Sequence, residues 1–166
     1  RLIVGFLLSP ARDCSILVKL TYSLTLIIEP LDNEKHDRAA FDCGVDQVNN
    51  YFKKTAKKLA DAGNARVYVA RNFSDNNVVG FYSINAHSVD YTDLPNKYKR
   101  TRPGHGSIPA AYISMIGVDQ RYSGNGFGGD LLVDALKRIA RASKDLGIEV
   151  VLIAVSYKHI EPTRPH

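Results

Sequence analysis

The spacing of apolar and polar residues changes several times along the chain, and each change predicts a new element. Short apolar runs bounded by turn residues predict strands over residues 24–30, 65–70, 78–86, 110–118 and 150–155. Two longer segments instead repeat apolar residues every three to four positions, as an amphipathic helix does. The first begins near residue 45, and the second is opened by a glycine-rich stretch that ends at Gly129. This succession of strands and helices predicts a single α/β domain.

The helices and turns carry further local signals. The first helix has an apolar stripe that ends at a capping glycine, Gly63. The second helix has a longer stripe, formed by Leu132, Ala135, Leu136, Ile139, Ala142 and Leu146. Between the helices, the turn residues Ser74–Asn77 separate two predicted strands and favour a hairpin.

The predicted domain covers residues 24–156. Residues 1–23 show neither helical nor strand period, so we interpret them as an extension outside the domain and expect the fold not to need them. Residues 157–166 contain two prolines and almost no apolar side chains, which predicts an irregular tail.

The most informative segment lies between the strand 110–118 and the second helix. It reads Asp119-Gln-Arg-Tyr-Ser-Gly124-Asn-Gly126-Phe-Gly-Gly129. Glycines let backbone N–H groups converge without Cβ clashes, and the start of a helix adds partial positive charge. A strand, a glycine-rich turn and a helix start therefore predict a cradle for an anion such as a pyrophosphate.

One interpretation of these glycines is dinucleotide binding. Gly124, Gly126 and Gly129 satisfy G-x-G-x-x-G, and Glu149 follows about twenty residues later. However, five residues separate the strand from the first glycine, and Glu149 precedes the next strand instead of ending it. We keep a dinucleotide-binding protein as the lesser alternative.

The second interpretation rests on a resemblance. Arg121-x-x-Gly124-x-Gly126, approached by Ile113–Asp119, resembles the R/Q-x-x-G-x-G/A motif of the GNAT superfamily of acetyl-CoA-dependent N-acetyltransferases. The upstream run Phe41-Asp-Cys-Gly-Val45, followed by an amphipathic helix, resembles the branch of bacterial toxins that acetylate aminoacyl-tRNA. The resemblance implies a GNAT fold, which is a mixed, mostly antiparallel sheet flanked by helices.

The resemblance also implies where acetyl-CoA binds as the acetyl donor. The expected contacts are Met115, Ile116, Gly117, Val118, Arg121, Gly124, Asn125, Gly126, Phe127, Gly128 and Gly129. A backbone N–H within Met115–Val118 is expected to stabilise the oxyanion that forms at the thioester. Many family members carry Arg or Lys where this chain has Asn125, so one positive charge is lost from the cradle.

The family's usual general acid, a tyrosine on a later helix, has no counterpart here, and the last strands of the fold are missing from the sequence. The C-terminus is therefore expected to be truncated and catalysis impaired. Tyr157 is the candidate for a substitute acid, and the alternative is that it is an aromatic residue packed at the end of the last strand. An inactive remnant that still binds acetyl-CoA or an antitoxin is the alternative function. A homodimer that supplies a strand in trans is a further expectation.

Charge adds one more candidate surface. The net charge is +5 with 23% charged residues, which is typical of a basic globular protein. A polar connection before the motif strand gathers the basic residues expected to contact tRNA, namely Lys97, Lys99, Arg100 and Arg102. The two cysteines form no disulfide framework and no metal spacing, and no apolar run reaches transmembrane length. We expect a cytoplasmic protein whose partners are acetyl-CoA, aminoacyl-tRNA and a cognate antitoxin.

Overall fold

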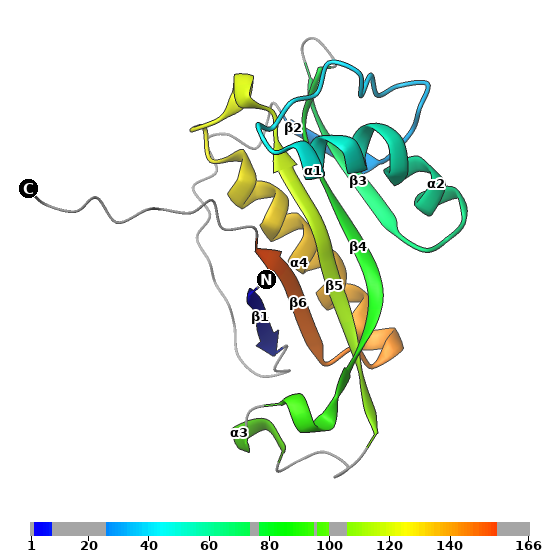
Figure 1. The fold of residues 1–166 in the computed structure, drawn as a ribbon, viewed down its shortest axis with the longest axis vertical. Helices are drawn as coiled ribbons and strands as arrows, with labels where there is room; N and C mark the ends of the chain where they lie inside the picture. Colours follow the sequence, from blue (N-terminus) through cyan, green and yellow to red (C-terminus); the bar gives the residue numbers. More distant parts are fainter. Residues whose placement is uncertain (1, 8–25, 74–76, 95, 100–105, 156–166) are drawn as a thin grey trace, which may run out of the picture.

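The computed structural model describes residues 2–7, 26–73, 77–94, 96–99 and 106–155 (Figure 1). Its centre is a six-stranded sheet in the order β1-β6-β5-β4-β3-β2. The strands are β1 (Leu2–Leu7), β2 (Leu26–Pro30), β3 (Arg66–Asn72), β4 (Val78–Asp90), β5 (Ser107–Val118) and β6 (Val150–Val155). Among these strands, only β5 and β6 pair in parallel. The predicted α/β class with a mixed, mostly antiparallel sheet is therefore confirmed.

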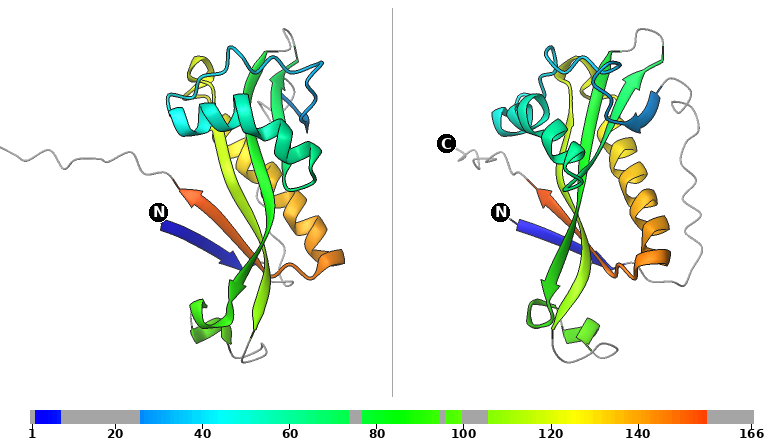
Figure 2. Two further views of the ribbon diagram at one scale, coloured as in Figure 1. Left: turned by 45° about the vertical axis from the view of Figure 1, so that its right-hand side comes forward. Right: turned by 90° about the vertical axis from the view of Figure 1, so that its right-hand side faces the viewer.

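Helices cover both faces of the sheet. They are α1 (Asp46–Asn50), the π-helical turn η1 (Tyr51–Thr55), α2 (Ala56–Asp61), α3 (Asn96–Lys99) and α4 (Phe127–Leu146), with short 3-10 turns η2 (Tyr91–Asp93) and η3 (Gln120–Tyr122). Figure 2 shows α4 on one side of the sheet, which we name the back face, and α1 and α2 on the other, which we name the front face. The described strands form a mostly antiparallel sheet, which differs from the doubly wound parallel sheet that the dinucleotide-binding interpretation requires.

The back face holds the largest core cluster. Leu131, Ala135 and Ile139 of α4 are buried against Ile113 of β5 and Val151 of β6. The predicted stripe of this helix is confirmed in part, because Leu146, at its last position, is 69% exposed. The helix ends where Gly147 adopts a left-handed φ of 65° and its N–H donates to the carbonyl of Ser143.

The front face has two smaller clusters. Under α1 and α2, the rings of Phe52 and Phe81 stack with their centres 4.1 Å apart, and the ring of Phe41 contacts both of them edge-on. Further along the sheet, Leu94 and Ile108 pack with residues of β6 beneath η2 and α3. The two clusters leave the middle of the front face between them.

The first predicted helix is continuous but not uniformly α-helical. The π-helical turn Tyr51–Thr55 lies between α1 and α2, and the Arg38 guanidinium donates a hydrogen bond of 2.9 Å to the carbonyl of Phe52. Single π turns widen the helix locally and leave a carbonyl for an outside donor. Hydrophobic spacing alone does not reveal such a turn.

We expected no helix or strand in residues 1–23, and this expectation is wrong, because Leu2–Leu7 forms the strand β1. All six of its residues pair antiparallel with β6, from Leu2 opposite Val155 to Leu7 opposite Val150. The strand β6 is apolar throughout. Because β1 pairs along the edge of β6 that faces away from β5, the backbone groups of that edge form hydrogen bonds that water would otherwise have to provide. The limits of the domain itself, 24–156, stay a prediction.

Deleting residues 1–23 tests what β1 contributes. We expect the deletion to cost about 2 kcal/mol, which lowers the midpoint of thermal unfolding by roughly 5 °C in a domain of this size. The deleted chain should also self-associate, because the edge of β6 becomes free. An unchanged midpoint, measured by circular dichroism, would show that the fold does not need this strand.

Candidate functional site

Strands β5 and β6 diverge midway along the sheet. They pair only from Ala110 opposite Val150 to Ile113 opposite Ile153, whereas β5 stays paired with β4 as far as Val118. Among the described residues, no strand pairs with the other edge of Ser114–Val118. We call this divergence the fork. Along it, backbone N–H and C=O groups of β5 are available to a ligand.

A β-bulge opens the fork. Ser83 pairs with Met115 and Ile84 with Ile113, so Ser114 has no partner on β4. As a result Ile113 packs in the back cluster while Met115 packs with the front one. The bulge is held from the front, where the Ser114 hydroxyl donates to Asn85 Oδ1 at 2.6 Å. The Asn85 amide in turn donates to the carbonyl of Asn64 at 3.0 Å.

The glycine turn follows the open part of β5. Gly124 and Gly126 both have a φ of +82°, which side chains rarely adopt. A Cβ on Gly124, Gly126 or Gly129 would meet no protein atom within 4 Å, so this surface faces open space. The first N–H groups of a helix lie at its positive end, and the earliest of them have no partner in a preceding turn. In α4, the N–H groups of Gly129 and Asp130 donate to the carbonyl of Gly126, and among the described residues those of Phe127 and Gly128 have no backbone partner. The turn therefore has the properties of an anion site.

A buried carboxylate, Asp119, fixes the turn. The Oδ1 atom of Asp119 accepts two hydrogen bonds from Arg121, one from its backbone N–H and one from its Nε, both at 2.9 Å. The Oδ2 atom accepts a third hydrogen bond, from Nη2 of the same guanidinium, at 2.9 Å. Oδ2 also accepts the N–H of Asp42 at 3.1 Å. The Asp119 side chain is 2% exposed, whereas that of Arg121 is 51% exposed. Four donors thus lock the start of the glycine turn.

Electrostatics agree with this geometry. Burial by itself raises the pKa of Asp119. The hydrogen bonds from Arg121 and Asp42 and the charge of the Arg121 guanidinium lower the pKa by more, so it lies below its usual range. Asp119 is therefore ionised at neutral pH. Its charge turns the Arg121 guanidinium toward the protein.

The Phe41–Val45 segment docks on this same turn. The Asp42 carbonyl accepts the N–H of Gln120 at 2.8 Å, beside the bond between Asp42 N–H and Asp119. The Asp42 carboxylate accepts the N–H of Gly44 at 2.8 Å and the amide of Asn49 at 2.7 Å. The pKa of Asp42 is lowered, chiefly by the hydrogen bond from the Gly44 backbone and then by Asn49. The two motifs that sequence reasoning found separately are thus in direct contact.

Close packing joins α1 to the open strand. A Cβ on Gly117 would lie 2.9 Å from Cγ1 of Val48 and 3.5 Å from Cβ of Cys43. Only glycine therefore lets α1 approach β5 this closely. Tyr51, the first residue of η1, reaches the sheet as well, and its hydroxyl lies 2.7 Å from Oγ of the buried Ser83.

The structure brings the predicted acetyl-CoA contacts together. Met115, Ile116, Gly117 and Val118 lie along the open edge, and Arg121 to Gly129 form the adjoining turn. Within the turn, the Asn125 amide donates to the carbonyl of Tyr122 at 3.1 Å, so this side chain closes the loop on itself. Phe127 packs against the back cluster, and a Cβ on Gly128 would only touch Val118.

The other predicted site residues lie elsewhere. Lys97 and Lys99 belong to α3, at the end of β5 opposite to the glycine turn (Figure 1). Lys99 Nζ donates to the carbonyl of Thr92 at 3.0 Å and lies 5.4 Å from the centre of the Tyr91 ring. Arg100, Arg102 and Tyr157 lie outside the described residues.

Sequence reasoning missed Asp119, Asp42 and the Ser114–Asn85 pair. An available signal was that an aspartate before a polar turn often accepts N–H groups two residues on, as Asp119 and Asp42 both do. The bulge at Ser114 left no such signal.

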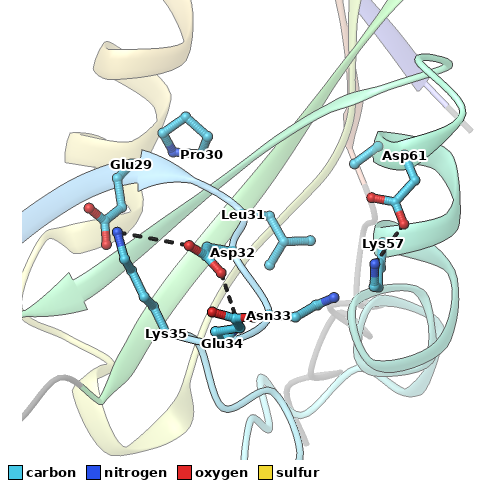
Figure 3. Close-up of a pocket in the computed structure, with 10 residues that line it drawn as sticks. Glu29, Pro30, Leu31, Asp32, Asn33, Glu34, Lys35, Lys57 and Asp61 are labelled. Atoms are coloured by element: carbon cyan, nitrogen blue, oxygen red, sulfur yellow. Dashed lines mark hydrogen bonds and ion pairs between the residues drawn. The ribbon is translucent and has the colours of Figure 1, made fainter.

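A hollow of about 540 Å³ lies away from the fork, between the end of β2 and α2 (Figure 3). Its charges pair with one another, as in Lys57–Asp61 at 2.7 Å and Lys35–Asp32 at 3.8 Å. Beside it, the buried His36 accepts the N–H of Asp32 and contacts Glu29 at 3.1 Å.

In the described part of the chain, no group of three metal-ligating side chains occurs, and no helix could span a membrane.

Replacing Asp119 by asparagine tests the lock on the glycine turn. We expect D119N to lose about 2–3 kcal/mol at pH 7, since charge-assisted hydrogen bonds to a buried group are lost. A depressed pKa means that the carboxylate stabilises the fold fully above about pH 4, and that this contribution disappears as the pH falls through the folded-state pKa. The gap in unfolding free energy between wild type and D119N should therefore shrink in acid.

The matched control for D119N is D61N, which removes an exposed carboxylate paired with Lys57. Its effect on stability should stay below about 1 kcal/mol. Urea unfolding at several pH values measures both variants. Equal stability of D119N and wild type at pH 7 would contradict the assigned role of Asp119.

Comparison with known proteins agrees with the fold and the motifs. No family model matches the chain. The chain is 64% identical to "Probable toxin TacT" from Sinorhizobium fredii over 129 residues, which are 78% of this chain and 71% of that protein. It is 30% identical to the "tRNA-acetylating toxin" of Mycobacterium tuberculosis over 73% of this chain and 70% of that protein.

Solved structures give the same fold. A structure of AtaT complexed with acetyl-methionyl-tRNAfMet matches with a TM-score of 0.72 and 22% identity, over 80% of this chain and 79% of that one. A crystal structure of AtaTR bound with AcCoA matches with a TM-score of 0.68 and 25% identity, over 81% and 80% of the two chains. With its fork, its glycine turn and its close curated relatives, the chain belongs to the GNAT acetyltransferase toxins.

Proposed function

We propose that this protein transfers an acetyl group from acetyl-CoA to the amino group of an aminoacyl-tRNA and thereby blocks translation. The observation that carries the proposal is the continuity of the fork with the glycine turn, because one extended ligand with a pyrophosphate and a thioester can follow both. The turn offers N–H donors to the pyrophosphate, and the open edge of β5 offers backbone groups to the rest of the ligand.

Structures of related folds support acetyl-CoA as the donor. The AtaTR complex holds AcCoA, and an AtaT structure contains both acetyl-CoA and the C-terminus of an antitoxin. In this chain, the N–H groups of Phe127 and Gly128 at the start of α4 are placed to receive the pyrophosphate. Met115–Val118 would hold the thioester arm along the strand.

The chemistry needs little beyond orientation and a few donors. An α-amino group has a pKa of about 8, so a useful fraction of it is neutral near pH 7. When the amine attacks the thioester carbonyl, a C–N bond forms, the C–S bond breaks, and the proton of the amine goes to the departing thiolate. A backbone N–H within Met115–Val118 would stabilise the negative charge on the carbonyl oxygen.

The acceptor is inferred from the relatives. The protein from M. tuberculosis is described as a tRNA-acetylating toxin, and the AtaT complex contains an acetylated aminoacyl-tRNA. The net charge of +5 suits a polyanionic substrate. A cytoplasmic location and a cognate antitoxin as partner follow from the same proposal.

Glycine substitutions test the donor site. Gly126→Val introduces a Cβ on the ligand-facing side of the turn and strains a φ of +82°. We expect the affinity for acetyl-CoA, measured by calorimetric titration, to fall about a hundredfold, which corresponds to the loss of about two charge-assisted hydrogen bonds.

The control for this variant is Gly63→Val. Gly63 also has a left-handed φ, +73°, and also faces open space, but it ends the helical segment on the front face. It should show a similar loss of stability with unchanged affinity. Equal acetyl-CoA binding by wild type and Gly126→Val would remove the glycine turn from the site.

A transfer assay tests the complete proposal. Purified chain is incubated with radiolabelled acetyl-CoA and total aminoacyl-tRNA, with deacylated tRNA as the control. We expect label in the aminoacylated RNA alone, released by mild base as N-acetyl amino acid. If the chain binds acetyl-CoA but transfers no label, the alternative of an inactive binding protein is correct.

A further inference from the structure

In the part of the chain that the structure describes, helix α4 covers the fork on the back face. On the back face, Leu131, Ala135 and Ile139 of α4 cover Ile113 and the facing residues of β6. On the front face, the middle of the sheet lies between the cluster under α1 and α2 and the cluster beneath α3. An amine that attacks a thioester held in the fork therefore approaches from the front.

Two aromatic rings lie on this front face beside the fork. Tyr112 precedes Ile113, the last residue of β5 that pairs with β6, and its ring is half-buried. His87 on β4 is exposed, and its ring centre lies 5.6 Å from that of Tyr112, tilted by 38°. Asn85 is directly opposite Tyr112 and accepts the hydrogen bond from Ser114 that holds the bulge. The rings thus form a shelf next to the bulge, and the transfer chemistry does not use them.

The position of the shelf matches the shape of an aminoacyl-tRNA end. His87 pairs with Ala110, three residues before the end of the β5–β6 pairing, so the shelf extends roughly 3–10 Å from the fork along the strand. In the substrate, one ester and one ribose separate the amine from the terminal adenine. With the amine at the fork and the substrate directed toward η2, the adenine can reach the two rings.

Charge continues in the same direction. Beyond His87, β4 leads into η2 and then α3, which carries Lys97 and Lys99. Tyr91 of η2 packs in the same cluster as Tyr112, and Lys99 Nζ lies over its ring. This end also carries the exposed carboxylates Asp90 and Asp93, so a strand of nucleic acid that leaves the shelf in this direction meets charges of both signs.

We propose that His87 and Tyr112 form the platform on which the terminal adenine of the aminoacyl-tRNA stacks. Unpaired bases are recognised by stacking on aromatic side chains, and the terminal nucleotide of a tRNA is unpaired. The platform fixes the distance between the adenine and the fork, so it positions the amine independently of the amino acid attached. This inference rests on the proposed function.

A fluorescent base tests the platform directly. The probe is an RNA hairpin that ends in single-stranded CCA, with 2-aminopurine in place of the terminal adenine, because stacking quenches the fluorescence of this base. The full chain should quench the probe on binding. His87→Ala and Tyr112→Leu should each remove most of the quenching and weaken RNA binding at least about fivefold, the lower end for one stacked base. Tyr112→Phe keeps a ring and should keep the quenching.

The control is Ser88→Ala, an exposed residue of β4 that alternation places on the opposite face from His87. It should quench like wild type. His87 is exposed, so His87→Ala decides the question even if Tyr112→Leu does not fold. The platform would be overturned if the wild-type chain bound the RNA without quenching its fluorescence, or if His87→Ala quenched it as strongly as wild type. The proposed function would still hold in either case if the chain transferred label to aminoacyl-tRNA. Absence of both RNA binding and label transfer would overturn the two together.

Discussion

The buried carboxylate of Asp119 is the interaction on which the arrangement of the site depends. It joins three parts of the chain: the end of β5, the turn that leads to α4, and the Phe41–Val45 segment before α1. A buried charge is stable only when donors surround it, and here Arg121 and two backbone N–H groups do so. The negative charge therefore fixes the direction in which the glycine turn leaves the sheet.

The fork adds a second constraint. The bulge at Ser114 reverses the alternation of β5, so that residues on either side of it pack against opposite layers. Pairing with β6 ends at the preceding residue, and β5 continues with one edge open. The same short stretch thus supplies core side chains to both faces and backbone groups to a ligand.

Sequence reasoning reached the fold class and the glycine turn, because apolar spacing and glycine positions are local properties. It placed the strands between residues 26 and 155 with roughly the right limits, and it identified Gly124 and Gly126, which do adopt left-handed backbone. It failed where pairing between distant segments decides the outcome. The strand Leu2–Leu7 exists because β6 is its partner, and the role of Asp119 depends on Asp42, 77 residues away.

The central claim is that one ligand occupies the fork and the glycine turn together, and amide hydrogen exchange with and without acetyl-CoA tests it most directly. Acetyl-CoA should slow exchange at Met115–Val118 and at Phe127 and Gly128 at the same time, because both segments donate N–H groups to it. Exchange of the backbone amides that line the hollow between β2 and α2 should not change. Protection of that hollow, or of neither segment of the site, would contradict the account.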